Sequence, residues 1–220
     1  MSRPIAVLRP EPGNRITAAA IEGRGRTAIR VPLFETRPLA WEVPDPRDFD
    51  ALILTSANAV RWAGEGLGPL RGLPVHAVGE ATASAARRAH FDVVAVGDAG
   101  AAALVVQAEV MGIRRALHLA GRERTIQAGG IVAAVLPVYA SELLPITAEQ
   151  VAALDGCVAL VQSARAGARL AEIVDDRRAV ILAAISEAAA KGAGLGWRAT
   201  AIAPRPETEA LIDLAIALAD

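Results

Sequence analysis

The fold of this chain is decided by the stretch Asp50–Arg61, which reads DALILTSANAVR. A short apolar run ends abruptly at Thr55 and Ser56, and Asn58 then opens an alanine-rich segment. This pattern predicts a buried parallel strand, a tight turn and the start of a helix. In open α/β sheets, such turns present hydroxyls and free backbone N–H groups to ligands. For one isolated turn, the alternative is that Ser56 or Asn58 only caps the helix.

The same pattern returns in the tail of the chain. LTSAN at residues 54–58 aligns with VQSAR at residues 161–165, an offset of 107 residues. Without a gap, this offset aligns two further strand ends, Gly79 with Ser186 and Gly97 with Pro204. Three strand ends in one register indicate the duplication of a βαβαβ unit.

Strand-like and helix-like segments alternate along the whole chain, which predicts an α/β protein with helices on both faces of parallel sheets. We expect two flavodoxin-like lobes, each with a parallel five-stranded sheet. One lobe is contiguous, residues 38–141, and the other is built from both chain ends, residues 1–37 and 142–220. Two proline-containing segments, Glu35–Arg47 and Ser141–Ile146, are predicted to be irregular crossover connectors between the lobes. A cleft between two lobes is the usual place for a small-molecule site.

Composition limits the possible partners of the 220-residue chain. Hydrophobic residues make up 53% and aromatic residues 3%, and the net charge is −1. This balance argues against nucleic acid or an anionic membrane as a partner. No secretion signal is seen and no apolar run reaches the ~18 residues of a membrane helix, so we expect a soluble, cytoplasmic protein. No segment reads as a dedicated interface, which favours a monomer.

A search for known motifs excludes several kinds of chemistry. No GxGxxG follows a strand, and neither a P-loop nor a GxSxG turn is present, so nothing supports a dinucleotide, a nucleotide or a serine nucleophile. The histidines have no metal-like spacing, and His76 and His118 are expected in the core. The single cysteine, Cys157, rules out a disulfide within the chain. We therefore expect no metal site.

Polar side chains and arginines at strand ends are what remains. Such a set suits a polyanion held by backbone N–H groups and a few arginines. For the arginines the alternative is solvation at the surface. For Tyr139, the only tyrosine, the alternative is an aromatic wedge at a crossover. The candidates are Arg9, Thr55, Ser56, Asn58, Thr82, Arg122, Arg124, Tyr139, Ser163 and Pro204. Asn14 is expected to cap the first helix.

Over essentially its whole length the chain resembles the uroporphyrinogen-III synthase family. Five short motifs carry the resemblance, in the same order as in the family: LRP at 8–10, LTSANAV at 54–60, VGEAT at 78–82, VY at 138–139 and AP at 203–204. The resemblance implies a cofactor-free lyase of haem biosynthesis. Its substrate is hydroxymethylbilane, a linear tetrapyrrole with eight carboxylates. The enzyme eliminates water, inverts the terminal D ring through a spiro intermediate and closes the ring to uroporphyrinogen III.

The resemblance also implies roles for individual residues. Tyr139 would donate a hydrogen bond or a proton to the departing hydroxyl. Ser56 and Thr82 would meet carboxylates of the substrate, and Arg9 and Arg122 would pair with its charges. The residues lining the cleft would be Thr55, Ser56, Asn58, Thr82, Ser163 and Pro204.

One turn departs from the family's pattern. Where the family has Ile-Gly-x-x-Thr, residues 185–189 read Ile-Ser-Glu-Ala-Ala, and Glu187 adds a negative charge where a polyanion would bind. Two alternatives to an active synthase therefore stay open. One is a non-catalytic, two-lobed cytoplasmic protein that binds a small anionic ligand, and the other is a catalytically decayed paralogue.

Overall fold

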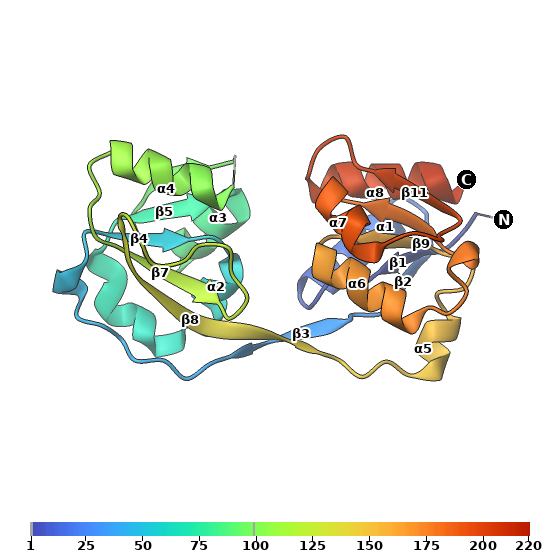
Figure 1. Ribbon diagram of the computed structural model, residues 1–220, viewed down its shortest axis with the longest axis horizontal. Coiled ribbons are helices and arrows are strands. Elements are labelled where there is room, and N and C mark those ends of the chain that lie inside the picture. Colours follow the sequence, from blue (N-terminus) through green and yellow to red (C-terminus); the bar gives the residue numbers. More distant parts are fainter. Residues whose placement is uncertain (1, 99) are drawn as a thin grey trace. The chain divides into compact units, whose positions relative to one another are not determined.

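The computed structural model describes residues 2–98 and 100–220, and the chain divides into two compact units. Unit 1 consists of Met1–Glu35 with Leu143–Asp220, and unit 2 is Thr36–Glu142 (Figure 1). Each unit contains one sheet with helices packed on it. No helix in the described part of the chain is both long and apolar enough to cross a membrane.

Unit 1 contains a parallel five-stranded sheet, as the alternating pattern predicts. Its order β11-β10-β9-β1-β2 is the flavodoxin order when the strands are numbered along the chain. Every residue of β1, β9 and β10 is buried, because helices cover both faces of a parallel sheet. The strands are β1 (Ile5–Val7), β2 (Ala28–Arg30), β9 (Val158–Val161), β10 (Ile181–Ala184) and β11 (Ala199–Ile202).

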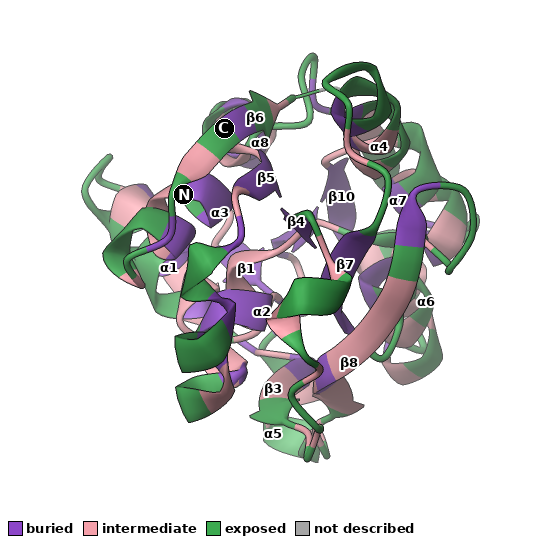
Figure 2. Ribbon diagram, turned by 90° about the vertical axis from the view of Figure 1, so that its left-hand side faces the viewer, coloured by how far each residue is buried: buried purple, intermediate pink, exposed green. Residues whose placement is uncertain are grey.

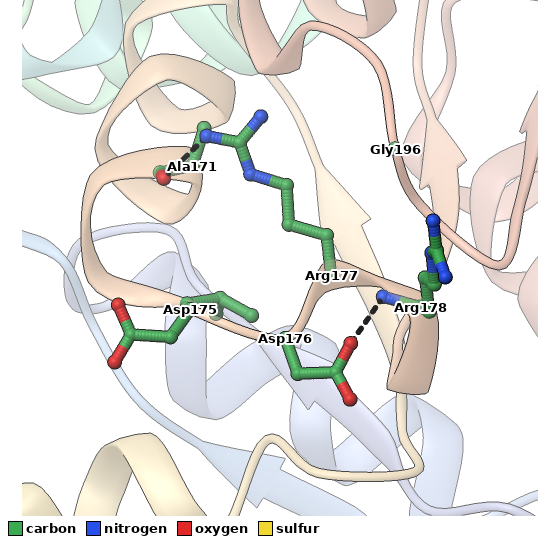
Figure 3. Close-up of a pocket in the computed structure, with 7 residues that line it drawn as sticks. Ala171, Asp175, Asp176, Arg177, Arg178 and Gly196 are labelled. Atoms are coloured by element: carbon green, nitrogen blue, oxygen red, sulfur yellow. Dashed lines mark hydrogen bonds between the residues drawn. The ribbon is translucent and has the colours of Figure 1, made fainter.

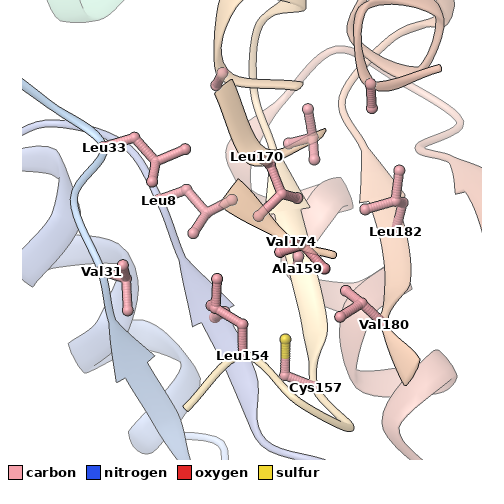
Figure 4. Close-up of a cluster of buried hydrophobic side chains, with 14 of the residues drawn as sticks. Leu8, Val31, Leu33, Leu154, Cys157, Ala159, Leu170, Val174, Val180 and Leu182 are labelled. Atoms are coloured by element: carbon pink, nitrogen blue, oxygen red, sulfur yellow. The ribbon is translucent and has the colours of Figure 1, made fainter. Parts of the chain in front are cut away.

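Two apolar clusters fill the two faces of this sheet. On one face Leu170 of α6 packs with Leu8 and Leu182 (Figure 4), and on the other Ile21 of α1 packs with Leu211 of α8. Burying each such side chain contributes roughly 1.5–3 kcal/mol. The helices of unit 1 are α1 (Gly13–Glu22), α5 (Ala148–Ala152), α6 (Ala164–Ile173), α7 (Glu187–Ala193) and α8 (Thr208–Ala219), with a 3₁₀ turn η3 (Arg177–Ala179).

Unit 2 carries a sheet of the order β3-β8-β7-β4-β5-β6. The strands from β4 to β8 are parallel to their neighbours, as predicted. Figure 2 shows the central strands β4, β5 and β7 as buried and the outer turns of the helices as exposed. The strands are β3 (Phe34–Pro38), β4 (Ala51–Leu54), β5 (Val75–Val78), β6 (Val93–Gly97), β7 (Ala116–Gly121) and β8 (Val132–Leu143). The helices are α2 (Ala57–Trp62), α3 (Glu80–Arg88) and α4 (Ala101–Val110), with 3₁₀ segments η1 (Pro46–Asp48) and η2 (Gly64–Gly72).

The expected purely parallel five-stranded sheet is wrong for unit 2, because β3 adds a sixth strand. Leu39 donates its N–H to the carbonyl of Val138 at 2.9 Å, and Leu144 donates to Leu33 at 3.0 Å, so β3 runs antiparallel to β8. The segments predicted as irregular connectors therefore pair with each other. Pro38 is tolerated in β3 because this is an edge strand, where one side of the backbone needs no partner.

The internal duplication is confirmed by the helix starts. Ser56, Gly79 and Gly100 are the N-caps of α2, α3 and α4. The offset of 107 residues carries them onto the N-caps of α6, α7 and α8, which are Ser163, Ser186 and Glu207. The sheets agree as well: β8-β7-β4-β5-β6 in unit 2 corresponds strand for strand to β2-β1-β9-β10-β11 in unit 1.

Candidate functional site

The strand order directs attention to one place in each sheet. Along both sheets the order of the strands reverses between two central neighbours, β1 and β9 in unit 1 and β7 and β4 in unit 2. Open α/β sheets bind ligands at the carboxyl ends of such strands. The loops that follow these four strands hold five of the candidates from the sequence: Arg9 after β1, Ser163 after β9, Arg122 after β7, and Thr55 and Ser56 after β4.

Ser56 and Ser163 have the same local role in the two units. The Ser56 hydroxyl accepts a hydrogen bond from the Asn58 N–H at 3.2 Å, and Ser163 accepts one from the Ala166 N–H at 3.1 Å. Both therefore cap their helices, which confirms the structural alternative considered for Ser56. A capping hydroxyl still carries its own proton, which it can donate to a ligand carboxylate. Asn58 is no cap, since its side-chain oxygen accepts a hydrogen bond from Arg61.

Tyr139 lies in β8, opposite Gly121 at the end of β7. Its half-buried ring packs against the core that includes Val138 and Leu119. A β-carbon at position 121 would come within 2.9 Å of the Tyr139 Cζ and within 3.0 Å of its hydroxyl oxygen. Tyr139 also accepts a backbone hydrogen bond from the Arg122 N–H at 2.8 Å. The tyrosine is thus both a packing residue and a fixed phenol at this edge.

The two candidate arginines differ in their partners. Arg122 pairs with Glu142 at 2.9 Å, and about half of each side chain is exposed. Such a surface pair contributes at most ~1 kcal/mol, so it can exchange for a substrate carboxylate. Arg9 is half-buried, and its burial lowers the pKa of the guanidinium. Its side chain bonds the Thr17 hydroxyl at 3.5 Å, and no acidic side chain in the described part of the chain pairs with it. A half-buried arginine of this kind favours an anionic ligand.

Thr82 and Pro204 lie further from the points where the strand order reverses. Thr82 is in the first turn of α3, after β5, and only 5% of it is exposed. Pro204 follows the edge strand β11 and is exposed. The structure thus brings Thr55, Ser56, Arg122 and Tyr139 to neighbouring strand ends of unit 2, and leaves Thr82 one strand away.

Asn14 is a residue whose role the sequence did not reveal. It was expected to cap α1, but it lies inside the helix and is fully buried. Its Nδ2 donates to the carbonyls of Val7 at 2.8 Å and Arg9 at 3.0 Å, and its Oδ1 accepts from Arg30 at 3.0 Å. Asn14 therefore fixes the loop that carries Arg9. Only the approach of β2 makes this network visible.

The family model of uroporphyrinogen-III synthase HemD matches residues 16–213. The chain belongs to the uroporphyrinogen-III synthase family. It is thereby an enzyme of haem biosynthesis, and its reaction, the cyclisation of hydroxymethylbilane, is of the lyase type.

Solved structures of synthases share the fold. Uroporphyrinogen-III synthetase from Helicobacter pylori 26695 is 20% identical, with a TM-score of 0.67 over 99% of this chain and 100% of that chain. A mutant synthase from the extremely thermophilic bacterium Thermus thermophilus is 19% identical, with a TM-score of 0.56 over 99% of both chains. Among curated protein sequences, none matches this chain closely.

The turn that departs from the synthase pattern is well formed. Ser186 accepts a hydrogen bond from the Ala189 N–H at 3.3 Å and so caps α7. The negative charge of Glu187 is not peculiar to this turn. The duplication places it on Glu80, which starts α3 and pairs with Arg87 at 2.6 Å. An acid at this position is therefore common to both units, because it is favourable at the positive end of a helix.

A separate cavity of unit 1 lies away from the synthase candidates. It has a volume of about 420 Å³ and is lined by residues before β10 and β11, at the amino end of the sheet. Arg177 dominates it, but this guanidinium donates to the carbonyls of Ala171 at 2.7 Å and Leu195 at 3.1 Å (Figure 3) and stacks on Trp197. These contacts give Arg177 a structural role.

The buried histidines are also structural. His118 contacts the Ile53 carbonyl at 3.0 Å, and burial lowers the pKa of both His76 and His118. In the described part of the chain, no group of three or more histidine, cysteine or acidic residues is arranged to hold a metal ion.

Proposed function

We propose that this chain performs the synthase reaction with groups at the carboxyl ends of its strands, and that Tyr139 acts on the departing hydroxyl. The observation that carries the proposal is the ladder of unit 2. It places the phenol of Tyr139 over Gly121, beside the strand end that carries Thr55 and Ser56. A phenol fixed at such an edge suits the donation of one proton to a leaving hydroxyl.

The reaction needs little acid–base equipment. As the C–O bond of the hydroxymethyl group breaks, its oxygen takes a proton and leaves as water. A carbon of the D ring then forms the new C–C bond through the spiro intermediate, and the proton released when the rings regain aromaticity restores the phenol. The larger task is to hold a flexible polyanion so that one of two ring carbons is attacked.

Neutral donors and arginines would hold the eight carboxylates. Ser56 and Ser163 can each donate a hydroxyl proton while they cap their helices. Arg9 offers a guanidinium without an acidic partner, and Arg122 offers one after release from Glu142. Thr55, Asn58, Thr82 and Pro204 would line the same surface. We propose no cofactor and no metal in this reaction.

Several finer features stay predictions of the sequence and the resemblance. These are two flavodoxin-like lobes with a cleft, the limits 1–37 with 142–220 and 38–141, a monomeric state and a cytoplasmic location.

The decisive experiment uses freshly prepared hydroxymethylbilane and separates the uroporphyrin isomers after oxidation. The proposal requires type III to dominate, because the bilane alone closes uninverted to type I. A product dominated by type I would leave the binding-protein or decayed-paralogue alternative, which the altered turn at Ser186 favours.

Tyr139→Phe tests the role of the phenol. The variant keeps the ring that packs on Gly121 and loses only the hydroxyl, so the fold should persist. Removing a general acid typically slows a reaction by about 10²–10⁴-fold. Unchanged turnover with an unchanged circular dichroism spectrum would remove Tyr139 from the mechanism.

A further inference from the structure

A groove between α2 and α3 distinguishes unit 2 from unit 1. It has a volume of about 270 Å³, and its floor is apolar. Two arginines flank it, Arg61 on α2 and Arg88 on α3, and none of the described residues lining it is acidic. The lining residues are Ala57, Val60, Arg61, Ala85, Arg88 and Ala89.

The corresponding helices of unit 1 leave no room for such a groove. A β-carbon at Gly192 of α7 would lie 2.3 Å from the Ala164 carbonyl oxygen of α6. One at Gly167 of α6 would lie 2.6 Å from the Ala193 backbone nitrogen of α7. The backbones of α6 and α7 therefore touch, and the two helices lie side by side in Figure 1.

The offset of 107 residues shows which residues open the groove in unit 2. It places Gly167 on Val60 and Gly192 on Ala85. The side chains at these two positions hold α2 and α3 apart, since helices approach this closely only through glycine. The flanking arginines are also particular to unit 2, because Arg61 corresponds to Ala168 and Arg88 to Leu195. The groove is therefore a feature of this unit and is not imposed by the fold.

Both arginines are exposed and are held only by neutral groups. Arg61 donates to the side-chain oxygen of Asn58, and Arg88 donates to the Ser84 hydroxyl at 2.8 Å. In the described part of the chain, neither forms an ion pair with an acidic side chain. By contrast, the adjacent Arg87 pairs with Glu80 at 2.6 Å. Each guanidinium thus retains donors for a carboxylate in the planar arrangement that arginine offers.

From the groove, its two arginines and its position we infer that unit 2 contains a subsite for one carboxylate-bearing pyrrole of the substrate. The inference rests on the proposed function. The groove begins at Ala57, the residue after the Ser56 cap, so it continues the strand-end surface. Its volume is just below the ~300 Å³ at which whole-ligand pockets begin, which suits a part of a large ligand. The apolar floor would contact the ring and the arginines its acidic arms.

The test compares Arg61→Gln and Arg88→Gln with Arg71→Gln. Arg71 is an exposed arginine of the same unit that lines no part of the groove. Loss of a charge-assisted hydrogen bond should raise KM about tenfold in each groove variant and leave kcat within about twofold. Added salt should raise KM in the wild type more than in these variants, because salt screens exposed charges. Arg71→Gln should match the wild type.

A second measurement is independent of catalysis. Uroporphyrin III carries the same eight carboxylates as the substrate, and its Kd can be measured by quenching of tryptophan fluorescence. The groove variants should weaken this Kd about tenfold. Ala89→Leu, which fills the groove without changing charge, should weaken it as well, with circular dichroism as a check of folding.

The outcomes separate the two proposals. If the wild type forms type I uroporphyrin but its Kd depends on Arg61 and Arg88, the proposed function fails and the subsite stands. If the wild type forms type III and both groove variants keep its KM and Kd, the subsite is overturned and the function stands. An equal change in Arg71→Gln also overturns the subsite, since it would reflect general charge alone.

Discussion

The ring of Tyr139 lies so close over Gly121 that no side chain fits between them. A β-carbon at position 121 would be 2.9 Å from the Tyr139 Cζ, a distance that real contacts do not show. The φ angle of Gly121 is not in the left-handed region, so the backbone itself would accept alanine. The glycine therefore serves the tyrosine, and substituting it moves the phenol without removing it.

Gly121→Ala is expected to slow turnover by about tenfold or more, because a misplacement of ~1 Å in a reacting group can cost 10²-fold. The measurement is kcat for uroporphyrinogen III formation. Gly72→Ala is the control, since Gly72 has nothing within 4 Å of an added β-carbon. If Tyr139→Phe is slow and Gly121→Ala is not, the position of the phenol matters less than its presence.

Gly192→Ala should destabilise unit 1. In a helix, alanine normally gains about 1 kcal/mol over glycine, but here the added carbon meets the Ala164 carbonyl at 2.3 Å. Overpacking of this kind costs about 1–3 kcal/mol, so α6 and α7 must separate and the free energy of unfolding should fall. Urea unfolding measures the change. A more stable variant would show that the two helices separate readily.

His118 should make stability depend on pH. Burial lowers its folded-state pKa below the usual ~6.5. Below pH ~6.5 the unfolded chain therefore binds the proton more readily, and each such histidine costs up to about 1.4 kcal/mol of stability per pH unit. Urea unfolding at pH 7.5 and 5.5 should show a smaller loss in His118→Gln than in the wild type. Parallel losses in the two proteins would exclude His118 as the cause, leaving His76.

Cys157 should be inert in the native protein. Its side chain is fully buried, and burial raises the pKa of the thiol to about 12. Since the thiolate is the reactive form, a thiol reagent such as DTNB should react only after unfolding in urea. Rapid labelling of the native chain would show that the core around Leu154 and Val174 opens readily.

The strands were the most predictable part of this molecule. Residues 51–54 read ALIL and residues 158–161 read VALV, and both form wholly buried strands. Continuous apolar runs of this kind mark parallel strands covered on both faces. Strand β3 was not predictable, because FETRP contains charges and a proline, and its partner β8 lies more than ninety residues along the chain.

The candidate site was predictable to the extent that strand ends are. Ser56, Ser163 and Tyr139 lie at strand ends that the apolar pattern already marked. Contacts that join separate loops could not be foreseen, such as those of Asn14 with Val7 and Arg30. The groove was missed for a similar reason, since it depends on the distance between two helices. One available signal was the exchange of Gly167 and Gly192 for Val60 and Ala85 across the duplication.

The insertion of unit 2 within unit 1 has a consequence during synthesis on the ribosome. Unit 2 has all its strands once β8 has emerged, and such contiguous units can fold while the chain is still growing. The apolar strand β1 must wait for its neighbour β9, about 120 residues after β2. At ~5–20 residues per second this delay is on the order of ten seconds. During it an open strand edge is available to other chains, so the nascent first 35 residues are where this protein most needs a chaperone.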